Sequence, residues 1–166
     1  MFGGWNVQPN LPHTLGGDTT RHNGAPCRPP VLVIASGNPH KVAEITAMLD
    51  AVQLEVRRQP EGLEIEETGS TYLENARLKA TEVARITGQW ALADDSGLEV
   101  DALGGEPGLY SARYAATDPE RIARLLRELG DSPYRSASFN SAMVLANPEG
   151  EAVLEAHGIC RGEILL

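Results

Sequence analysis

Val31-Leu32-Val33-Ile34-Ala35 is a continuous run of apolar residues, bounded by Pro30 and Gly37. Such a run is typical of a strand that is buried on both faces. The apolar spacing that follows predicts a helix over residues 40–49. Its buried face would consist of Val42, Ile45, Met48 and Leu49. A buried strand followed directly by a helix indicates an α/β or α+β fold with a mixed sheet.

Two more helices are marked by their ends. Thr71 and Glu74 form a capping-box pattern that opens a helix, and Gly88 closes it. Asp118 as N-cap, with Pro119 at the first helical position, opens a later helix that ends at Gly130. The buried face of this later helix would consist of Ile122, Leu125, Leu126 and Leu129.

Further strands follow from alternation and turn chemistry. A short strand over residues 90–93 is expected to end at Asp94-Asp95-Ser96-Gly97, with residues 98–100 as another candidate strand. Apolar and polar residues alternate over residues 137–145, which predicts a strand. The turn residues 147–150 then predict a returning hairpin partner over residues 153–159.

Composition limits the class of protein. The 166 residues, 42% hydrophobic and 22% charged, suit one soluble globular domain, for which the cytoplasm is the expected location. No run approaches the roughly 18 apolar residues of a membrane span. Cys27 and Cys160 fit no metal-ligand spacing and indicate reduced thiols. The net charge of -9 argues against nucleic-acid binding, although a metal ion can bridge an acidic protein to a polyphosphate.

Charged residues are unevenly distributed. Between Glu61 and Asp101 there are ten acidic and three basic residues. This cluster is either a solvated surface or a site that collects a cation. Lys41 and Lys79 are the only lysines beside twelve arginines, which hints at positions that require a compact ammonium.

The polar segment after the first strand has the features of an anion site. Backbone N–H groups at a helix N-terminus attract anions, helped by the helix dipole. Ser36 and Asn38 add neutral hydrogen-bonding groups, and Lys41 can pair with a phosphate. The glycine spacing is not that of a Walker A loop. An ordinary strand–helix turn is the alternative.

Carboxylates gather at two other places. Asp94 and Asp95 follow a predicted strand, where they could hold a divalent cation and orient or deprotonate a water. Glu66 and Glu67 precede the second helix. The alternatives are turn-forming aspartates and a solvated loop. A phosphate loop combined with two carboxylate clusters favours metal-assisted attack on a phosphoanhydride.

Four segments resemble the inosine/xanthosine triphosphate pyrophosphatase family. They are residues 33–41 with Glu44 beyond, residues 66–80, residues 104–114 and the central stretch Ala93-Asp94-Asp95-Ser96-Gly97-Leu98-Glu99-Val100-Asp101-Ala102-Leu103. The resemblance covers residues 31 to about 164. It implies an α/β (mixed α+β) fold with a long mixed sheet flanked by helices, in two lobes with a central cleft, and usually a homodimer.

The resemblance also implies an activity and a set of site residues. Family members use Mg²⁺ to cleave non-standard purine nucleoside triphosphates (ITP, dITP, XTP) between the α- and β-phosphates. By likeness, Asp95 would be the catalytic base, and magnesium would be held by Glu67 and Asp95 with support from Asp94. The substrate-binding residues would be Ser36, Gly37, Asn38, Pro39, His40, Lys41, Asn75, Lys79 and Ser96.

The two ends of the chain carry separate expectations. Family members continue beyond the Gly162 region into Phe-Gly-Tyr-Asp and Ser-His-Arg motifs that this sequence does not contain. We therefore expect residues 31–166 to be a C-terminally truncated pyrophosphatase domain with an incomplete second lobe, after a disordered extension at residues 1–30. The alternative function is an inactive remnant that binds metal-nucleotide or a partner subunit without turnover. A pyrophosphatase for modified pyrimidine nucleotides is disfavoured by residues 93–103.

Overall fold

The computed structural model describes residues 28–165, in which five strands form one mixed sheet in the order β2-β1-β3-β4-β5. The sheet joins β1 (Val31–Ile34) and β2 (Glu55–Arg58) to the longer strands β3 (Trp90–Val100), β4 (Ser136–Ala146) and β5 (Ala152–Glu163). β1 is parallel to both β2 and β3, whereas β4 is antiparallel to both β3 and β5. The predicted mixed sheet and hairpin are confirmed. Most of the extension predicted at residues 1–30 lies outside the described residues.

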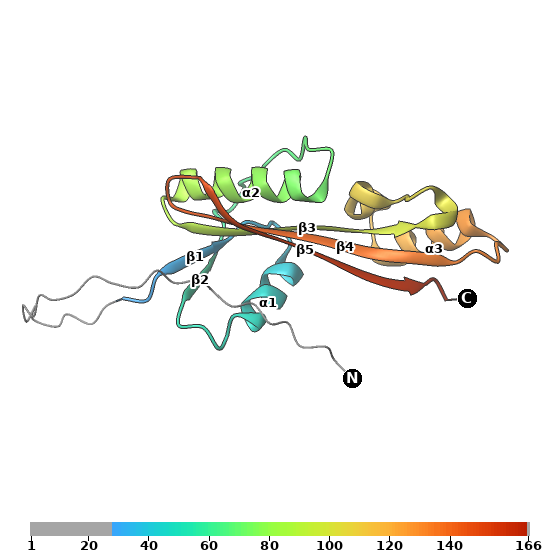
Figure 1. The fold of residues 1–166 in the computed structure, drawn as a ribbon, viewed down its shortest axis with the longest axis horizontal. Coiled ribbons are helices and arrows are strands. Elements are labelled where there is room, and N and C mark those ends of the chain that lie inside the picture. The colour runs from blue at the N-terminus through green and yellow to red at the C-terminus, as the bar shows by residue number, and fades with distance from the viewer. Residues whose placement is uncertain (1–27, 166) are drawn as a thin grey trace, which may run out of the picture.

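The helices cover the sheet at both of its ends (Figure 1). Near β1, α2 (Tyr72–Thr87) packs on one face and α1 (Pro39–Met48) on the other. Far from β1, α3 (Asp118–Leu129) packs on the long strands, beside the 3₁₀ segments η1 (Asp101–Leu103) and η2 (Gly108–Arg113). The sheet flanked by helices agrees with the predicted fold class.

Small side chains let α2 lie close to the sheet. Ala76, Ala80 and Ala84 are fully buried and share a cluster with Ala91 and Ala93 of β3. Because an alanine contributes little thickness, the helix backbone can approach the strands closely. The polar side chains on the same side of α2 can therefore reach the edge of β3.

The ends of α2 agree with the sequence prediction. Thr71 is the N-cap and its hydroxyl accepts from the Glu74 N–H at 3.1 Å, while Gly88 ends the helix with φ 64°. Such a cap stabilises a helix by about 1 kcal/mol. The capping box is not reciprocal, however, because the Glu74 carboxylate accepts instead from the Ser70 N–H.

Two helix predictions were partly wrong. In α1, Val42 and Ile45 are buried but Met48, the last helical residue, is 69% exposed, because it faces a cavity that Phe139 and Met143 also line. In α3, Thr117 rather than Asp118 is the N-cap, since its hydroxyl and Glu120 complete a capping box. Ile122 is 58% exposed, because α3 buries only a narrow face.

The strand predictions also need correction at β3. This strand does not stop at residue 93 but continues unbroken through Asp94-Asp95-Ser96-Gly97, because each of these residues pairs with β4. The edge strand β2 was not predicted. Its Glu55 and Arg57 side chains are exposed and interrupt any apolar pattern.

Because β1 is shorter than β3, the edge of β3 that faces away from β4 has no strand neighbour over part of its length. β1 ends at Ile34, which pairs with Leu92, whereas β3 continues to Val100. Loops take over along this free edge. Ser111 Oγ accepts from the Leu98 N–H at 2.9 Å, and the Glu106 carbonyl accepts from the Val100 N–H at 3.2 Å.

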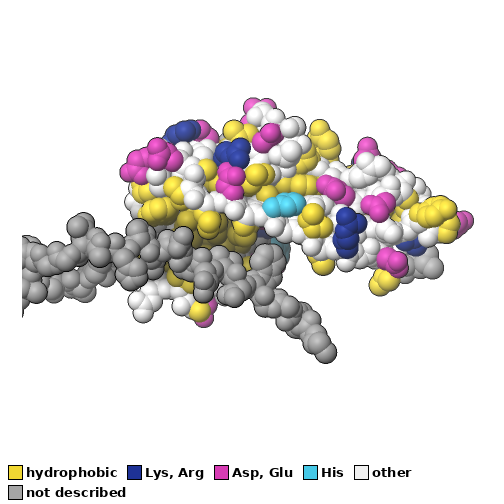
Figure 2. Space-filling view, viewed as in Figure 1, with side chains coloured by type: hydrophobic (Ala, Val, Ile, Leu, Met, Phe, Trp, Pro, Cys, Tyr) yellow, Lys and Arg dark blue, Asp and Glu magenta, His cyan; other side chains and the backbone are white. Residues whose placement is uncertain are grey.

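β5 forms the edge of the sheet opposite to β2, and all twelve of its residues are exposed. Figure 2 shows hydrophobic side chains between charged ones on the face of the molecule drawn there. The exposed apolar residues of β5 include Val153, Leu154 and Ile159. Within residues 28–165, no helix combines the length and apolar character needed to cross a bilayer.

Gly97 sets the distance between β3 and η2. A Cβ at this position would lie 2.3 Å from the Gly108 carbonyl oxygen and 2.7 Å from Tyr72 Oη. Ser111 Oγ would be 2.9 Å away. Only a residue without a side chain lets η2 lie directly on the strand.

We predict that Gly97→Ala destabilises the protein by about 1–3 kcal/mol, because the added methyl group overpacks this contact. Urea denaturation of both proteins measures the difference. Gly158→Ala is the matched control, since a Cβ there meets nothing within 4 Å. Equal stability of the two variants would contradict the close contact between β3 and η2.

Candidate active site

A cavity of about 340 Å³ opens at the free edge of β3. Its volume lies in the range of small-molecule sites. The walls come from the turn after β1, the segment before α2, the middle of β3 and η2. The side chains that could act on a ligand are those of Ser36, Asn38, Lys41, Gln59, Glu64, Glu67, Lys79, Asp94, Asp95, Ser96 and Arg113.

Asp94 and Asp95 lie in the middle of β3, where successive side chains point to opposite faces of the sheet. The Asp94 carboxylate lies on the α1 side, and the Asp95 carboxylate lies on the α2 side. The two adjacent acids therefore have different partners. Both still line the cavity, because it lies at the strand edge.

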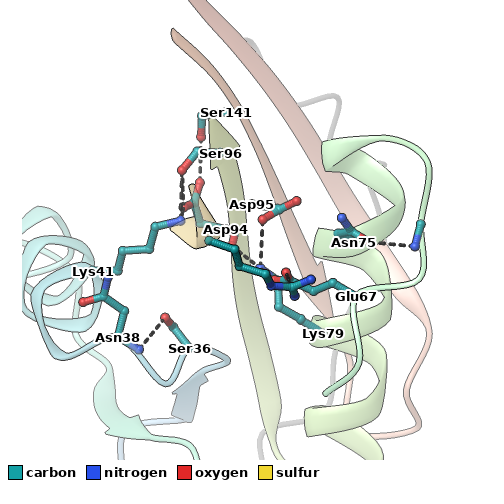
Figure 3. Close-up of polar contacts among 12 residues, drawn as sticks. Ser36, Asn38, Lys41, Glu67, Asn75, Lys79, Asp94, Asp95, Ser96 and Ser141 are labelled. Carbon is teal, nitrogen blue, oxygen red and sulfur yellow. Dashed lines mark hydrogen bonds and ion pairs between the residues drawn. The ribbon is translucent and has the colours of Figure 1, made fainter. Parts of the chain in front are cut away.

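Asp94 forms a network with Lys41 and two hydroxyls (Figure 3). Lys41 Nζ donates to Asp94 Oδ2 at 2.6 Å and to Ser96 Oγ at 2.9 Å. Ser141 Oγ of β4 donates to Asp94 Oδ1 at 2.7 Å. Because both carboxylate oxygens have partners, Asp94 holds the Lys41 ammonium in a fixed position against β3.

Lys79 joins the other acids. Its ammonium donates to Glu67 Oε1 at 2.8 Å and to Asp95 Oδ1 at 3.2 Å. A third bond, of 2.9 Å, goes to the Asp94 carbonyl oxygen on the free edge of β3. The Lys79 side chain is only 14% exposed, so these contacts are partly shielded from water. One ammonium thereby holds two carboxylates side by side.

The loop that carries Glu67 is fixed by Asn75. Asn75 is 3% exposed, and its Oδ1 accepts from the Gly69 N–H at 2.8 Å. A Cβ on Gly69 would lie 2.7 Å from that same oxygen. Next to it, two hydrogen bonds from Ser70 hold the pKa of Glu74 below its usual range.

The turn between β1 and α1 is partly occupied by its own side chains. Asn38 is the N-cap of α1, and its Oδ1 accepts from the His40 N–H at 2.9 Å. Ser36 Oγ accepts from the Asn38 N–H at 3.2 Å. These two N–H groups are satisfied internally, so a ligand in this turn would depend strongly on Lys41 for charge.

The structure brings most of the predicted site residues together. Glu67, Asp94 and Asp95, together with Lys41 and Lys79, line the cavity along with Ser36, Gly37, Asn38 and Ser96. Pro39 and His40 lie in the first turn of α1 and are not part of this lining, and neither is Asn75. The roles assigned to these residues stay predictions.

Sequence reasoning gave no role to Arg113 or Ser141. Arg113 lies at the end of η2, and its Nη2 donates to Glu67 Oε2 at 2.9 Å. The two partners are 46 residues apart in the chain. Ser141 is 47 residues from Asp94. No local spacing indicates either contact, although Arg113 falls within the segment 104–114 that carried the family resemblance.

Tyr72 is buried beneath the site. Its Oη is the one buried side-chain polar atom without a hydrogen-bond partner among residues 28–165. Burial raises the pKa of Tyr72 above its usual range, and the nearby carboxylates of Glu99 and Asp95 add to the shift. A tyrosine phenol is neutral at neutral pH and the raised pKa keeps it so at higher pH, so it adds no negative charge next to Asp95.

A second cavity, of about 220 Å³, adjoins the first. Lys41, Asp94 and Ser96 form the boundary, since all three line both cavities. The second cavity is also lined by Met143 and by Phe139, whose side chain is 50% exposed. An exposed ring of this kind offers a surface on which a flat apolar group can stack.

The charged groups suit a ligand that combines a cation with an anion. In the described part of the chain, no three His, Cys, Asp or Glu side chains are grouped as a complete metal site. Mg²⁺ rarely needs one, because it usually binds one or two carboxylates and completes its shell with water and phosphate oxygens. Glu67 and Asp95, held together by Lys79, form such a pair.

The chain is similar to known proteins over most of its length. The model of the Ham1 family matches residues 32–166. A dITP/XTP pyrophosphatase of Synechococcus sp. (strain CC9311) is 57% identical over 134 residues, which are 81% of this chain and 65% of that protein. A dITP/XTP pyrophosphatase of Nostoc sp. (strain PCC 7120 / SAG 25.82 / UTEX 2576) is 54% identical over 135 residues, which are 81% of this chain and 69% of that protein. This chain thus spans less than two thirds of the length of the Synechococcus protein.

Solved structures agree. A HAM1 protein from Coxiella burnetii matches with a TM-score of 0.72 and 44% identity, over 81% of this chain and 73% of that one. The Ham1 protein of Staphylococcus aureus matches with a TM-score of 0.70 and 39% identity, over 81% and 72% of the two chains.

We predict that Asn75→Ala loosens the loop that carries Glu67. The change leaves the Gly69 N–H without its buried partner, which costs about 1–3 kcal/mol of stability. Faster hydrogen exchange of the Gly69 amide, measured by NMR, would locate the effect. Unchanged exchange at Gly69 would show that Asn75 does not hold this loop.

Proposed function

Because the chain belongs to the Ham1 family, we propose that it hydrolyses non-standard purine nucleoside triphosphates such as ITP, dITP and XTP. The products would be the nucleoside monophosphate and pyrophosphate. One observation carries the proposal: Lys79 holds Glu67 and Asp95 side by side in a cavity that Lys41 also lines. Cations and paired carboxylates in one cavity are the groups that phosphoanhydride hydrolysis requires.

Lys41 and the turn before α1 would bind the triphosphate. Asp94 and Ser96 fix the Lys41 ammonium, so little side-chain freedom is lost when a phosphate binds. Ser36, Gly37 and Asn38 line the same part of the cavity. Lys79 would contribute a second ammonium. Pro39 contributes by starting α1, which directs the positive end of the helix dipole to this turn.

Glu67 and Asp95 would hold a magnesium ion. Both carboxylates contact the same ammonium, so they lie close enough together to bind one cation through their oxygens. When bound, the ion neutralises phosphate charge and activates water. Asp94 would support the site from outside, by holding Lys41 rather than by direct ligation.

Asp95 would be the general base. Among the described residues, Lys79 is the one hydrogen-bond donor to the Asp95 carboxylate and binds Oδ1 alone, which leaves Oδ2 to accept a proton from water. Asp95 is 9% exposed, so its carboxylate acts where competing bulk water is limited. Lys79 keeps the carboxylate aimed into the cavity.

Phe139 would contact the nucleoside. The cavity that it lines adjoins the proposed phosphate site at Lys41 and Ser96. A base stacked there would keep its triphosphate within reach of the Lys41 ammonium. The family resemblance adds two finer proposals, a homodimer and a cytoplasmic location. The joint presence of Glu67, Asp95 and Lys41 in one cavity favours turnover over a remnant that binds without reacting.

We predict that the 166-residue chain releases pyrophosphate from ITP with Mg²⁺, faster than from GTP, and that Asp95→Asn lowers the rate by about 10²–10⁴-fold. The substitution removes the base and changes the side-chain shape little. A coupled pyrophosphate assay measures the release, and circular dichroism checks that the variant is folded. An Asp95→Asn variant as fast as the wild type would refute the role of Asp95.

Lys41→Ala should raise KM for ITP by about 10-fold or more, because one charge-assisted hydrogen bond to phosphate is lost. Steady-state kinetics over a range of ITP concentrations would separate KM from kcat. Arg57→Ala is the matched control, since Arg57 pairs with Glu55 on the edge strand β2 and does not line the cavity. An unchanged KM in Lys41→Ala would remove Lys41 from the phosphate site.

A further inference from the structure

Glu67 is held by a different cation at each carboxylate oxygen. Lys79 Nζ lies 2.8 Å from Oε1, and Arg113 Nη2 lies 2.9 Å from Oε2. Because Lys79 also contacts Asp95, four charges of alternating sign form a chain from Arg113 to Asp95. Both proposed magnesium ligands are therefore neutralised by the protein's own cations.

The two cations are anchored very differently. Lys79 is 14% exposed and makes a third bond, to the Asp94 carbonyl oxygen. The Arg113 side chain is 62% exposed, and Glu67 is the one residue among 28–165 with which this side chain forms a hydrogen bond or ion pair. An ion pair this exposed contributes little stability and breaks easily. Arg113 is thus the cation that can leave without disturbing the fold.

The Arg113 guanidinium also lies where it can contact a ligand. Its side chain lines the same cavity as Lys41 and the turn before α1. A guanidinium presents several N–H donors in a planar fork that matches a phosphate group. The close packing of η2 on Gly97 keeps the backbone of Arg113 near the site, while most of its side chain remains exposed.

We propose that Arg113 is an exchangeable counter-ion, which occupies Glu67 in the free protein and moves to the substrate phosphates when Glu67 takes a divalent cation. The proposal rests on the function proposed above. Arg113 then competes with the metal ion for Glu67 but assists the nucleotide. Removal of Arg113 should have effects of opposite sign on the two ligands.

The test measures Mn²⁺ binding to the nucleotide-free 166-residue chain by isothermal titration calorimetry. Arg113→Ala should bind Mn²⁺ about 3-fold more tightly than the wild type, the size expected when one exposed ion pair no longer competes. The control is Arg77→Ala, which removes the same charge from an arginine that pairs with Glu155 outside the cavity. This variant should show a smaller change, due to net charge alone.

Kinetics with ITP measure the opposite effect, which is the one on the nucleotide. Arg113→Ala should raise KM by about 10-fold, because a charge-assisted contact with phosphate is lost. Arg113→Lys should bring Mn²⁺ affinity back toward the wild-type value, because an ammonium can also pair with Glu67. Equal or weaker Mn²⁺ binding by Arg113→Ala than by Arg77→Ala would overturn the proposal, as would an absence of Mn²⁺ uptake by all of these proteins.

The outcomes separate this proposal from the function on which it rests. Pyrophosphate release by the wild type, with no gain in Mn²⁺ affinity in Arg113→Ala, would leave the function standing and refute the exchange. Tighter Mn²⁺ binding by Arg113→Ala, without pyrophosphate release by the wild type, would support competition at Glu67 and refute the function.

Discussion

β1 is too short to cover β3. It has four residues beside the eleven of β3, and from Ala93 onward the outer edge of β3 has no strand neighbour. Backbone polar groups on such an edge need partners. Lys79, Ser111 and Glu106 supply them from α2, η2 and the loop before η2. The segments that satisfy the edge are largely those that enclose the cavity, so the site follows from an unfinished strand pairing.

The same constraint governs the charges. Partly buried carboxylates are costly unless they are paired and hydrogen-bonded. Here Asp94 pairs with Lys41, and Glu67 and Asp95 share Lys79. An acidic protein can therefore keep carboxylates close together without strong mutual repulsion. Because the ammonium groups of these lysines face a cavity, they can also bind a phosphate group.

The features predicted correctly from sequence have local signals. A few consecutive residues are enough to indicate each of them: the apolar run of β1, the Thr71 cap of α2 and the turn before β5. The path of β3 does not, because Asp94-Asp95-Ser96-Gly97 has the composition of a turn. Pairing with β4 overrides that preference. The division of labour between the two aspartates follows from this continuous strand and could not be inferred from a predicted loop.

Contacts between segments that are far apart in the sequence were the second kind of feature that sequence patterns alone could not predict. The resemblance brought Glu67, Asp95 and Lys41 into one predicted site, and the cavity places them together. It gave no role to Arg113, whose contact with Glu67 depends on η2 lying against Gly97. A glycine required for close approach looks the same in a sequence as a glycine required for a turn. Only the packed structure distinguishes the two.

The exposed edge of β5 bears on how the protein behaves among copies of itself. A long edge strand presents free backbone groups to any other strand that meets it. Its apolar side chains are interrupted by Glu155, Arg161 and Glu163, whose charges discourage edge-to-edge pairing. Interactions of such exposed charges are screened by salt. Colloidal behaviour should therefore depend on crowding and ionic strength under conditions in which every molecule is still folded.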